Sequence, residues 1–203
     1  NIFTVGDVMY DATLFYNEFN ASRQTIVDKL GLKSNSFILS TIHRAENTDD
    51  IKRLENICNA LVELSTEHKV ILPLHPRTKA VLEKNQWLSE LTRKIDILEP
   101  VGYLDMLALE KAAHLIITDS GGVQKEAYFN QVPCITLRDE TEWVELVESG
   151  WNMICTPAQP FSLNDLLGRY QKTDSLNYEP LYGSGNAAEA IIKIMTKNSI
   201  SCI

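Results

Sequence analysis

The amino-acid sequence predicts an α/β protein whose core is one doubly wound parallel sheet. Apolar stretches of strand length alternate with stretches in which apolar residues recur every three or four positions, as in successive β-α-β units. No internal repeat or low-complexity tract interrupts this alternation. At 203 residues, with 44% hydrophobic and 23% charged residues, the chain is long enough to bury a core of its own.

The expected elements follow one another in a regular order. Strands are expected at residues 36–42, 69–74, 95–98, 114–118, 133–137 and 153–155. Helices are expected between them at residues 51–64, 79–91, 104–112 and 122–129, where apolar side chains recur at helical spacing. The flanks differ from this core. Residues 1–32 predict a short strand and one helix over 11–30, and a last helix is expected at 186–197 after a turn-rich connector.

Charge and cysteine content exclude several classes of function. A formal net charge of −8 and a pI near 5.0 argue against broad binding to nucleic acid, although they allow a local anion site. Cysteines at positions 58, 134, 155 and 202 lie far apart, which predicts buried thiols rather than a zinc site or a disulfide framework.

The sequence has no membrane-spanning run and no signal peptide, so we expect a cytoplasmic protein. It starts with Asn1 rather than Met, which suggests a missing upstream segment.

The run "HLIITDSGGVQKEA" places a polar, glycine-containing turn between an expected strand and an expected helix. Ligands of doubly wound sheets bind at the carboxyl ends of the strands. Ser120 can cap the helix, and Gly121 and Gly122 carry no Cβ atom that would keep an anion from the backbone N–H groups, which indicates a phosphate site. One turn further on, Glu126 can accept hydrogen bonds from ribose hydroxyls. The alternative, a tight turn followed by a surface acid, stays open from this motif alone.

Two further loops are expected at the same edge of the sheet. "HRAEN" follows the first expected strand, and "HPRT" follows the second. Either His43 or His75 taken singly is compatible with a structural role. Together, each with an arginine one or two residues further on, they favour a site for a diphosphate.

Two other stretches have competing interpretations. In "LRDETEWVE" the acids can cap the next helix, or Arg138, Thr141 and Glu142 can bind sugar hydroxyls, and the spacing does not choose between them. "GSGNAA", at residues 183–188, matches a dinucleotide-binding fingerprint. Because no apolar strand precedes it, we interpret it as a turn and the start of a helix, and a nicotinamide cofactor is not supported.

The motifs "HRAEN", "HPRT", "TDSGGVQKEA", "LRDETEWVE" and "YGSGNAAE", in this order, resemble those of the non-hydrolysing UDP-N-acetylglucosamine 2-epimerases. The resemblance runs over most of the chain and concerns the C-terminal half of that family, whose members have two Rossmann-like domains in the GT-B arrangement. It implies an exit segment and linker helix over residues 1–32, a UDP-binding Rossmann-like domain over 33–183 and a crossover helix over 184–203. A missing N-terminal domain and, in the complete enzyme, a second copy in a homodimer are the implied protein partners.

The resemblance also implies a reaction. The family inverts C2 of a UDP-linked N-acetylhexosamine by eliminating UDP to give a 2-acetamidoglucal and adding it back from the other face, without a metal or cofactor. By this resemblance Ser120, Gly121, Gly122 and Glu126 match the UDP-binding stretch, and His43 matches a functional histidine assigned here as catalytic. Arg44 and His75 match positions that some bacterial members associate with a second, regulatory UDP-sugar.

Departures from the family pattern concern the substrate. Met106 stands where an aromatic residue often packs beside uracil, and with Arg138 it is expected to contact the substrate. "TEWVE" resembles members that act on UDP-2,3-diacetamido-uronic acid sugars. The carboxylates proposed as general base belong to the other domain, so this chain alone is expected to bind UDP weakly and not to turn over. The alternatives are a GT-B glycosyltransferase, a hydrolysing epimerase, and a UDP-sugar-binding domain without catalysis.

Overall fold

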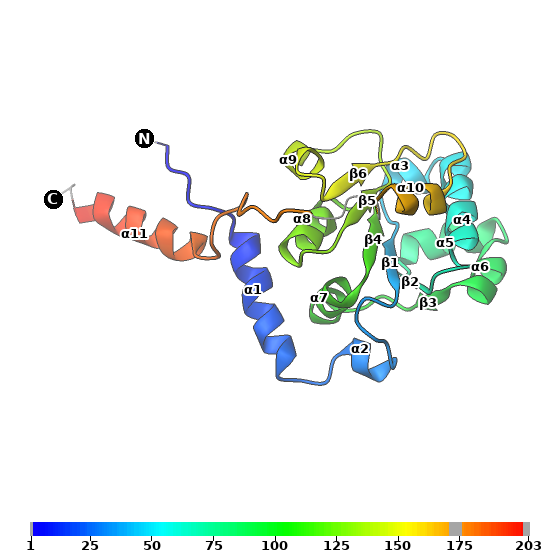
Figure 1. The fold of residues 1–203 in the computed structure, drawn as a ribbon, viewed down its shortest axis with the longest axis horizontal. Coiled ribbons are helices and arrows are strands. Elements are labelled where there is room, and N and C mark those ends of the chain that lie inside the picture. The colour runs from blue at the N-terminus through cyan, green and yellow to red at the C-terminus, as the bar shows by residue number, and fades with distance from the viewer. Residues whose placement is uncertain (1, 171–175, 201–203) are drawn as a thin grey trace.

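The computed structural model describes residues 2–170 and 176–200 and contains one six-stranded sheet (Figure 1). Its strands are all parallel and lie in the order β3-β2-β1-β4-β5-β6. This order is that of a Rossmann-type sheet and confirms the doubly wound fold. The strands are β1 (Ile38–Thr41), β2 (Val70–Pro73), β3 (Asp96–Leu98), β4 (Leu115–Thr118), β5 (Cys134–Thr136) and β6 (Asn152–Ile154).

Helices cover both faces of the sheet, because strand side chains alternate between two apolar clusters. Ile38 and Ile117 point into one cluster, and Leu39 and Ile116 point into the other. The first cluster is covered by α4 (Ile51–Leu64), α5 (Pro76–Lys84), α6 (Leu88–Lys94) and α10 (Leu163–Tyr170). The second is covered by α2 (Ile26–Lys29), α7 (Tyr103–Ala112) and α8 (Gly121–Phe129) (Figure 1). Two short helices, α3 (Ala45–Thr48) and α9 (Val144–Glu148), follow β1 and β5.

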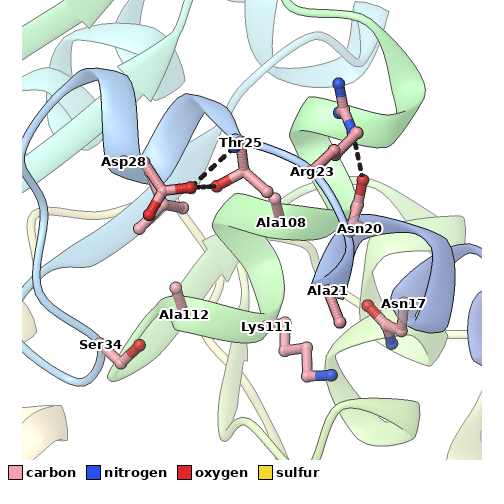
Figure 2. A pocket seen from close by; sticks show the side chains of 11 residues that line it. Asn17, Asn20, Ala21, Arg23, Thr25, Asp28, Ser34, Ala108, Lys111 and Ala112 are labelled. Atoms are coloured by element: carbon pink, nitrogen blue, oxygen red, sulfur yellow. Dashed lines mark hydrogen bonds between the residues drawn. The ribbon is translucent and has the colours of Figure 1, made fainter.

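The N-terminal flank differs from the prediction. The single helix expected over residues 11–30 is wrong, since α1 (Val8–Ala21) ends before a new helix, α2, begins, and residues 2–32 contain no strand. The break is local chemistry: the Asp28 carboxylate accepts hydrogen bonds from the backbone and the hydroxyl of Thr25, which starts α2 with a capping box. Figure 2 shows this pair near the bond that the Arg23 side chain donates to the Asn20 side chain, at the end of α1.

The helix expected over residues 79–91 is also two helices. It begins earlier, at Pro76, because Pro suits the first helical position and the His75 ring accepts a hydrogen bond from the Arg77 amide. It ends at Lys84, and Gln86 adopts a left-handed conformation with φ of 62° before α6 starts. That conformation stops an α-helix.

The C-terminal helix α11 (Ala187–Ile200) extends away from the sheet (Figure 1). Its first amide groups, those of Ala187 and Ala188, donate to the Asp11 carboxylate at 3.0 and 2.8 Å, which joins α11 to α1. The stretch "GSGNAA" is a turn and helix start, as expected. Within the described ranges, none of the helices combines the length and hydropathy needed to cross a bilayer. Cys58, Cys134 and Cys155 are buried, as expected, and Cys202 lies outside these ranges.

Candidate functional site

The loops after β1 and β4 meet where the strand order reverses. These two strands are neighbours, although β2, β3 and their helices separate them in the sequence. In open parallel sheets the crevice for ligands forms outside the carboxyl ends of such a pair. The Thr41 and Thr118 hydroxyls, one at the end of each strand, form a buried hydrogen bond of 2.6 Å. The "HRAEN" loop and the "DSGG" turn are therefore brought together, as predicted.

The Asp119 carboxylate joins the two loops. It is fully buried and accepts hydrogen bonds from the His43 amide at 3.1 Å, the Arg44 amide at 3.0 Å and the Asn47 side chain at 3.1 Å. The Nδ1 atom of His43 lies 3.5 Å from the same carboxylate, while 40% of the His43 side chain remains exposed. Asp119 thus holds the backbone of the first loop and sets the direction of the His43 ring.

The turn itself presents amide donors. Ser120 is the N-cap of α8, and its hydroxyl accepts from the Val123 amide at 3.5 Å, which confirms the predicted cap. The Ser120 amide donates a hydrogen bond to the Thr118 hydroxyl at 2.9 Å. Among the described residues no acceptor binds the amide N–H groups of Gly121 or Gly122. Two donors at the positive end of a nine-residue helix are therefore available to an anion.

The two glycines have different surroundings. A Cβ atom added at Gly121 would lie 2.5 Å from the Glu142 carboxylate and 3.5 Å from the Arg44 guanidinium. A Cβ atom added at Gly122 would instead lie 3.5 Å from the side chain of Met9, an ordinary packing contact. Only the absence of a side chain at Gly121 opens the charged side of the turn.

Three charged residues surround that opening. Glu142 forms ion pairs with Arg44, at 3.5 Å, and with Arg138. Of the two interpretations left open for "LRDETEWVE", capping of the next helix by its acids is not what the structure shows, because Trp143 is the N-cap of α9 and no side chain caps that helix. Thr141 instead donates to the Gln124 side chain at 2.6 Å, which fastens this loop to α8.

His43, His75 and Met106 line a mostly apolar cavity of about 150 Å³. The His43 and His75 rings have their centroids 5.9 Å apart and their planes tilted by 39°. Thr41, Ile42, Pro73, Leu74, Pro100, Val101 and Val123 complete the lining. This cavity has room for a flat ring next to the turn. A separate polar cavity of about 490 Å³ lies between α1, α2 and α7, away from these loops (Figure 2).

Comparison with known proteins settles the family. The model of the family described as UDP-N-acetylglucosamine 2-epimerase matches residues 1–196. This chain belongs to the UDP-N-acetylglucosamine 2-epimerase family. Among relatives, a UDP-N-acetylglucosamine 2-epimerase homolog from Methanococcus maripaludis is 43% identical over 96% of this chain and 54% of its own length. The UDP-2,3-diacetamido-2,3-dideoxy-D-glucuronate 2-epimerase of Pseudomonas aeruginosa is 44% identical over 97% of this chain and 53% of its own.

Solved structures of epimerases of this family share the fold. The Methanocaldococcus jannaschii UDP-GlcNAc 2-epimerase, determined in complex with UDP-GlcNAc and UDP, superposes with a TM-score of 0.83 at 38% identity. The match covers 97% of this chain and 55% of that structure. The chain therefore spans about half the length of the relatives it matches, and its α/β sheet corresponds to one Rossmann-like half of their GT-B fold.

Glu126 lies deeper in this epimerase-family site than the sequence suggests. Only 6% of it is exposed, and it faces α7, where Glu110 is fully buried. Burial raises the pKa of Glu126 to about 6, and the nearby positive charge of Lys125 only partly opposes this rise. Burial and the neighbouring Glu126 also raise the pKa of Glu110 well above its ordinary value.

Several residues that shape the site escaped the sequence interpretation. Asp119, Asn47 and Gln124 are buried polar residues, and each joins two or more loops. Trp143 donates from its indole N–H to the Gly121 carbonyl at 2.9 Å. The one sequence feature that could have pointed to these residues is their position, since each lies within a few residues of the end of an expected strand.

We predict that the Glu110 and Glu126 pair makes stability fall as pH rises. Their pKa values are higher in the folded state, so the folded state binds more protons above pH 4.5, and its advantage is lost as pH rises through about 6 for Glu126. Relative to a Glu110→Gln/Glu126→Gln variant, the wild-type free energy of unfolding should decrease by at least about 2 kcal/mol between pH 4.5 and 7, because the raised pKa of Glu126 alone supplies about that amount. Urea denaturation at several pH values measures this, and parallel curves for the two proteins would contradict it.

Proposed function

We propose that this chain is the UDP-binding half of a UDP-N-acetylglucosamine 2-epimerase, or of a close UDP-diacetamido-uronate 2-epimerase, that inverts C2 by eliminating UDP and adding it back. The observation that carries the proposal is the pair of available amide donors at Gly121 and Gly122, beside Arg44 and at the reversal in strand order. An N-terminal domain and a second copy of the complete protein are the proposed partners. Buried thiols at Cys58 and Cys155 support a cytoplasmic location.

The diphosphate is proposed to bind the N-terminus of α8. Its oxygens would accept from the Gly121 and Gly122 amides and meet the Arg44 guanidinium, which lies on the open side of Gly121. In the structure the Glu142 carboxylate occupies part of this space. A bound phosphate would take its place beside Arg44 and leave Glu142 with Arg138, at the position expected for the sugar.

The uridine is proposed to extend from the turn, with its ribose at Glu126 and its uracil in the cavity that contains His43. Glu126 lies five residues beyond Gly121, about 7.5 Å along the helix axis, which suits the distance from a diphosphate to its ribose. As a carboxylate it would accept hydrogen bonds from both ribose hydroxyls, so binding favours a pH above its pKa. The cavity lined by His43, His75 and Met106 is the proposed uracil site.

The proposed chemistry uses the same groups. When UDP departs, negative charge grows on the diphosphate, where the α8 amides and His43 can stabilise it by about 3 kcal/mol for each well-placed donor. The carboxylate of Asp119 would stabilise His43 when it is protonated. Removal of the C2 proton needs a positioned base. We assign no base in this chain, and by the family resemblance that group would come from the other domain.

A Gly121→Val variant should lose UDP binding. The added side chain enters the space of the diphosphate, and the Glu142 carboxylate that it meets is partly exposed and can move, so we expect the fold to survive. Isothermal titration calorimetry with UDP should give an affinity at least about tenfold lower than that of the wild type, the equivalent of 1.4 kcal/mol. Gly168→Val is the matched control, because an added Cβ there meets nothing within 4 Å. Equal UDP binding by all three proteins would refute the phosphate site.

A Glu126→Ala variant tests the ribose assignment separately. Wild type should bind UDP more tightly than 2′-deoxy-UDP, because the deoxy ligand leaves one carboxylate acceptor unused. The variant should lose most of this preference, and competition titrations of both ligands measure it. Glu83→Ala, which removes an exposed carboxylate on α5, should keep the preference. A preference that survives in Glu126→Ala would show that the ribose binds elsewhere.

The sugar has two candidates, because relatives named for different substrates are similarly identical to this chain. The complete protein should convert UDP-N-acetylglucosamine or the diacetamido-uronate analogue to its C2 epimer while the sugar stays linked to UDP. Nuclear magnetic resonance of the products identifies the preferred sugar. Release of free sugar would instead indicate a hydrolysing enzyme, and transfer to an acceptor would indicate a glycosyltransferase.

A further inference from the structure

The peptide unit between Gly121 and Gly122 is held from one side. Trp143 donates its indole N–H to the Gly121 carbonyl oxygen at 2.9 Å. A trans peptide is planar, with its carbonyl and its N–H pointing in opposite directions. Whatever holds the Gly121 carbonyl therefore also sets the direction of the Gly122 N–H, one of the two available donors of the turn.

Trp143 is itself held in place. The Lys125 ammonium lies 4.4 Å from the centre of the indole, within the range of a cation–π contact, and only 8% of the Lys125 side chain is exposed. Tyr182 and Phe129 complete a cage around the same ammonium, with ring centres at 5.1 and 5.9 Å. The Trp143 amide donates to the Thr141 hydroxyl at 3.2 Å, which fixes the start of α9.

The cage also reaches the segments that precede α1 and α11. Lys125 forms an ion pair with Asp7, whose amide donates to the Tyr182 carbonyl at 3.0 Å. The two segments touch at Gly6 and Gly183, where an added Cβ at Gly183 would lie 3.0 Å from the Gly6 Cα atom. A continuous series of contacts thus runs from this crossing through Lys125 and Trp143 to the turn.

We propose that Trp143 is a positioning residue that aims the Gly122 N–H at the diphosphate, and that Lys125 holds Trp143 in the required place. The inference rests on the proposed function, since it assumes that a diphosphate binds this turn. Trp143 acts through the peptide unit and contacts no ligand atom. Its effect on affinity is therefore confined to contacts with the phosphate part of the nucleotide. A purely structural role would lower the affinity of the domain for every ligand alike.

The test compares UDP with uridine, which lacks phosphate. Trp143→Phe keeps a ring beneath Lys125 and deletes the N–H donor. UDP affinity should fall by about 3- to 10-fold, the effect of one lost hydrogen bond, while uridine affinity stays unchanged. Chemical-shift titrations by nuclear magnetic resonance suit both ligands because they measure weak binding. Lys125→Met should also lower the affinity for UDP. The Trp143→Phe/Lys125→Met double variant should lose no more binding free energy than the sum of the two single losses.

Trp151→Phe is the matched control. Trp151 is buried and, like Trp143, donates its indole N–H to a backbone carbonyl, but its partner is the Asn177 carbonyl, at 3.1 Å, which is not part of the turn. This variant should leave UDP affinity unchanged, and thermal unfolding of each variant checks that the fold is kept. If Trp143→Phe does not fold, replacement of the indole by benzothiophene removes the N–H alone and gives the same test.

The outcomes separate the inference from the proposed function. If wild type binds no UDP, the proposed function fails. If wild type binds UDP and Trp143→Phe binds it equally well, the positioning role is overturned. It is also overturned if the affinity of Trp143→Phe for uridine falls as much as its affinity for UDP. A third outcome that overturns it is a loss of UDP affinity in Trp151→Phe as large as the loss in Trp143→Phe.

Discussion

The buried carboxylate of Asp119 is the interaction on which the candidate site depends. It lies at the end of β4 and accepts hydrogen bonds from the backbone of the loop after β1, so it fixes two loops that are more than seventy residues apart in sequence. A fully buried carboxylate is stable only when several donors surround it, and two loop amides and Asn47 supply them. The exposed face of His43 and the open N-terminus of α8 both follow from that one arrangement.

Parallel topology explains why these residues can meet at all. All six strands end at the same edge, so short polar motifs from distant parts of the sequence arrive side by side without a dedicated interface. Because β1 and β4 are neighbours and their following helices cover opposite faces, side chains between them are not covered by a crossover. The crevice is thus a consequence of strand order, and the loop residues determine what it binds.

Periodicity was sufficient to predict the sheet and its six strands, because burial of strands on both faces leaves a strong apolar signal. It failed where side chains interrupt a helix, as in the Thr25–Asp28 capping box, or where the backbone leaves helical geometry, as at Gln86. The loops of the site were predictable because they follow strands. Asp119 and Trp143 were not, since their partners are backbone atoms whose distance in space no local pattern records.

Charge balance at the turn explains why positioning matters. Glu142 supplies a carboxylate to Arg44 and Arg138, so these cations are not left unpaired beside the positive end of α8. An incoming diphosphate therefore gains only the difference between its own contacts and those of Glu142. Where the net gain is small, the direction of each amide donor decides affinity, because a donor that must reorient spends part of that gain. Two glycines at the start of a helix, as in α8, give that first turn little stiffness of its own. Its rigidity has to come from neighbours, and Asp119 and Trp143 hold it from two sides.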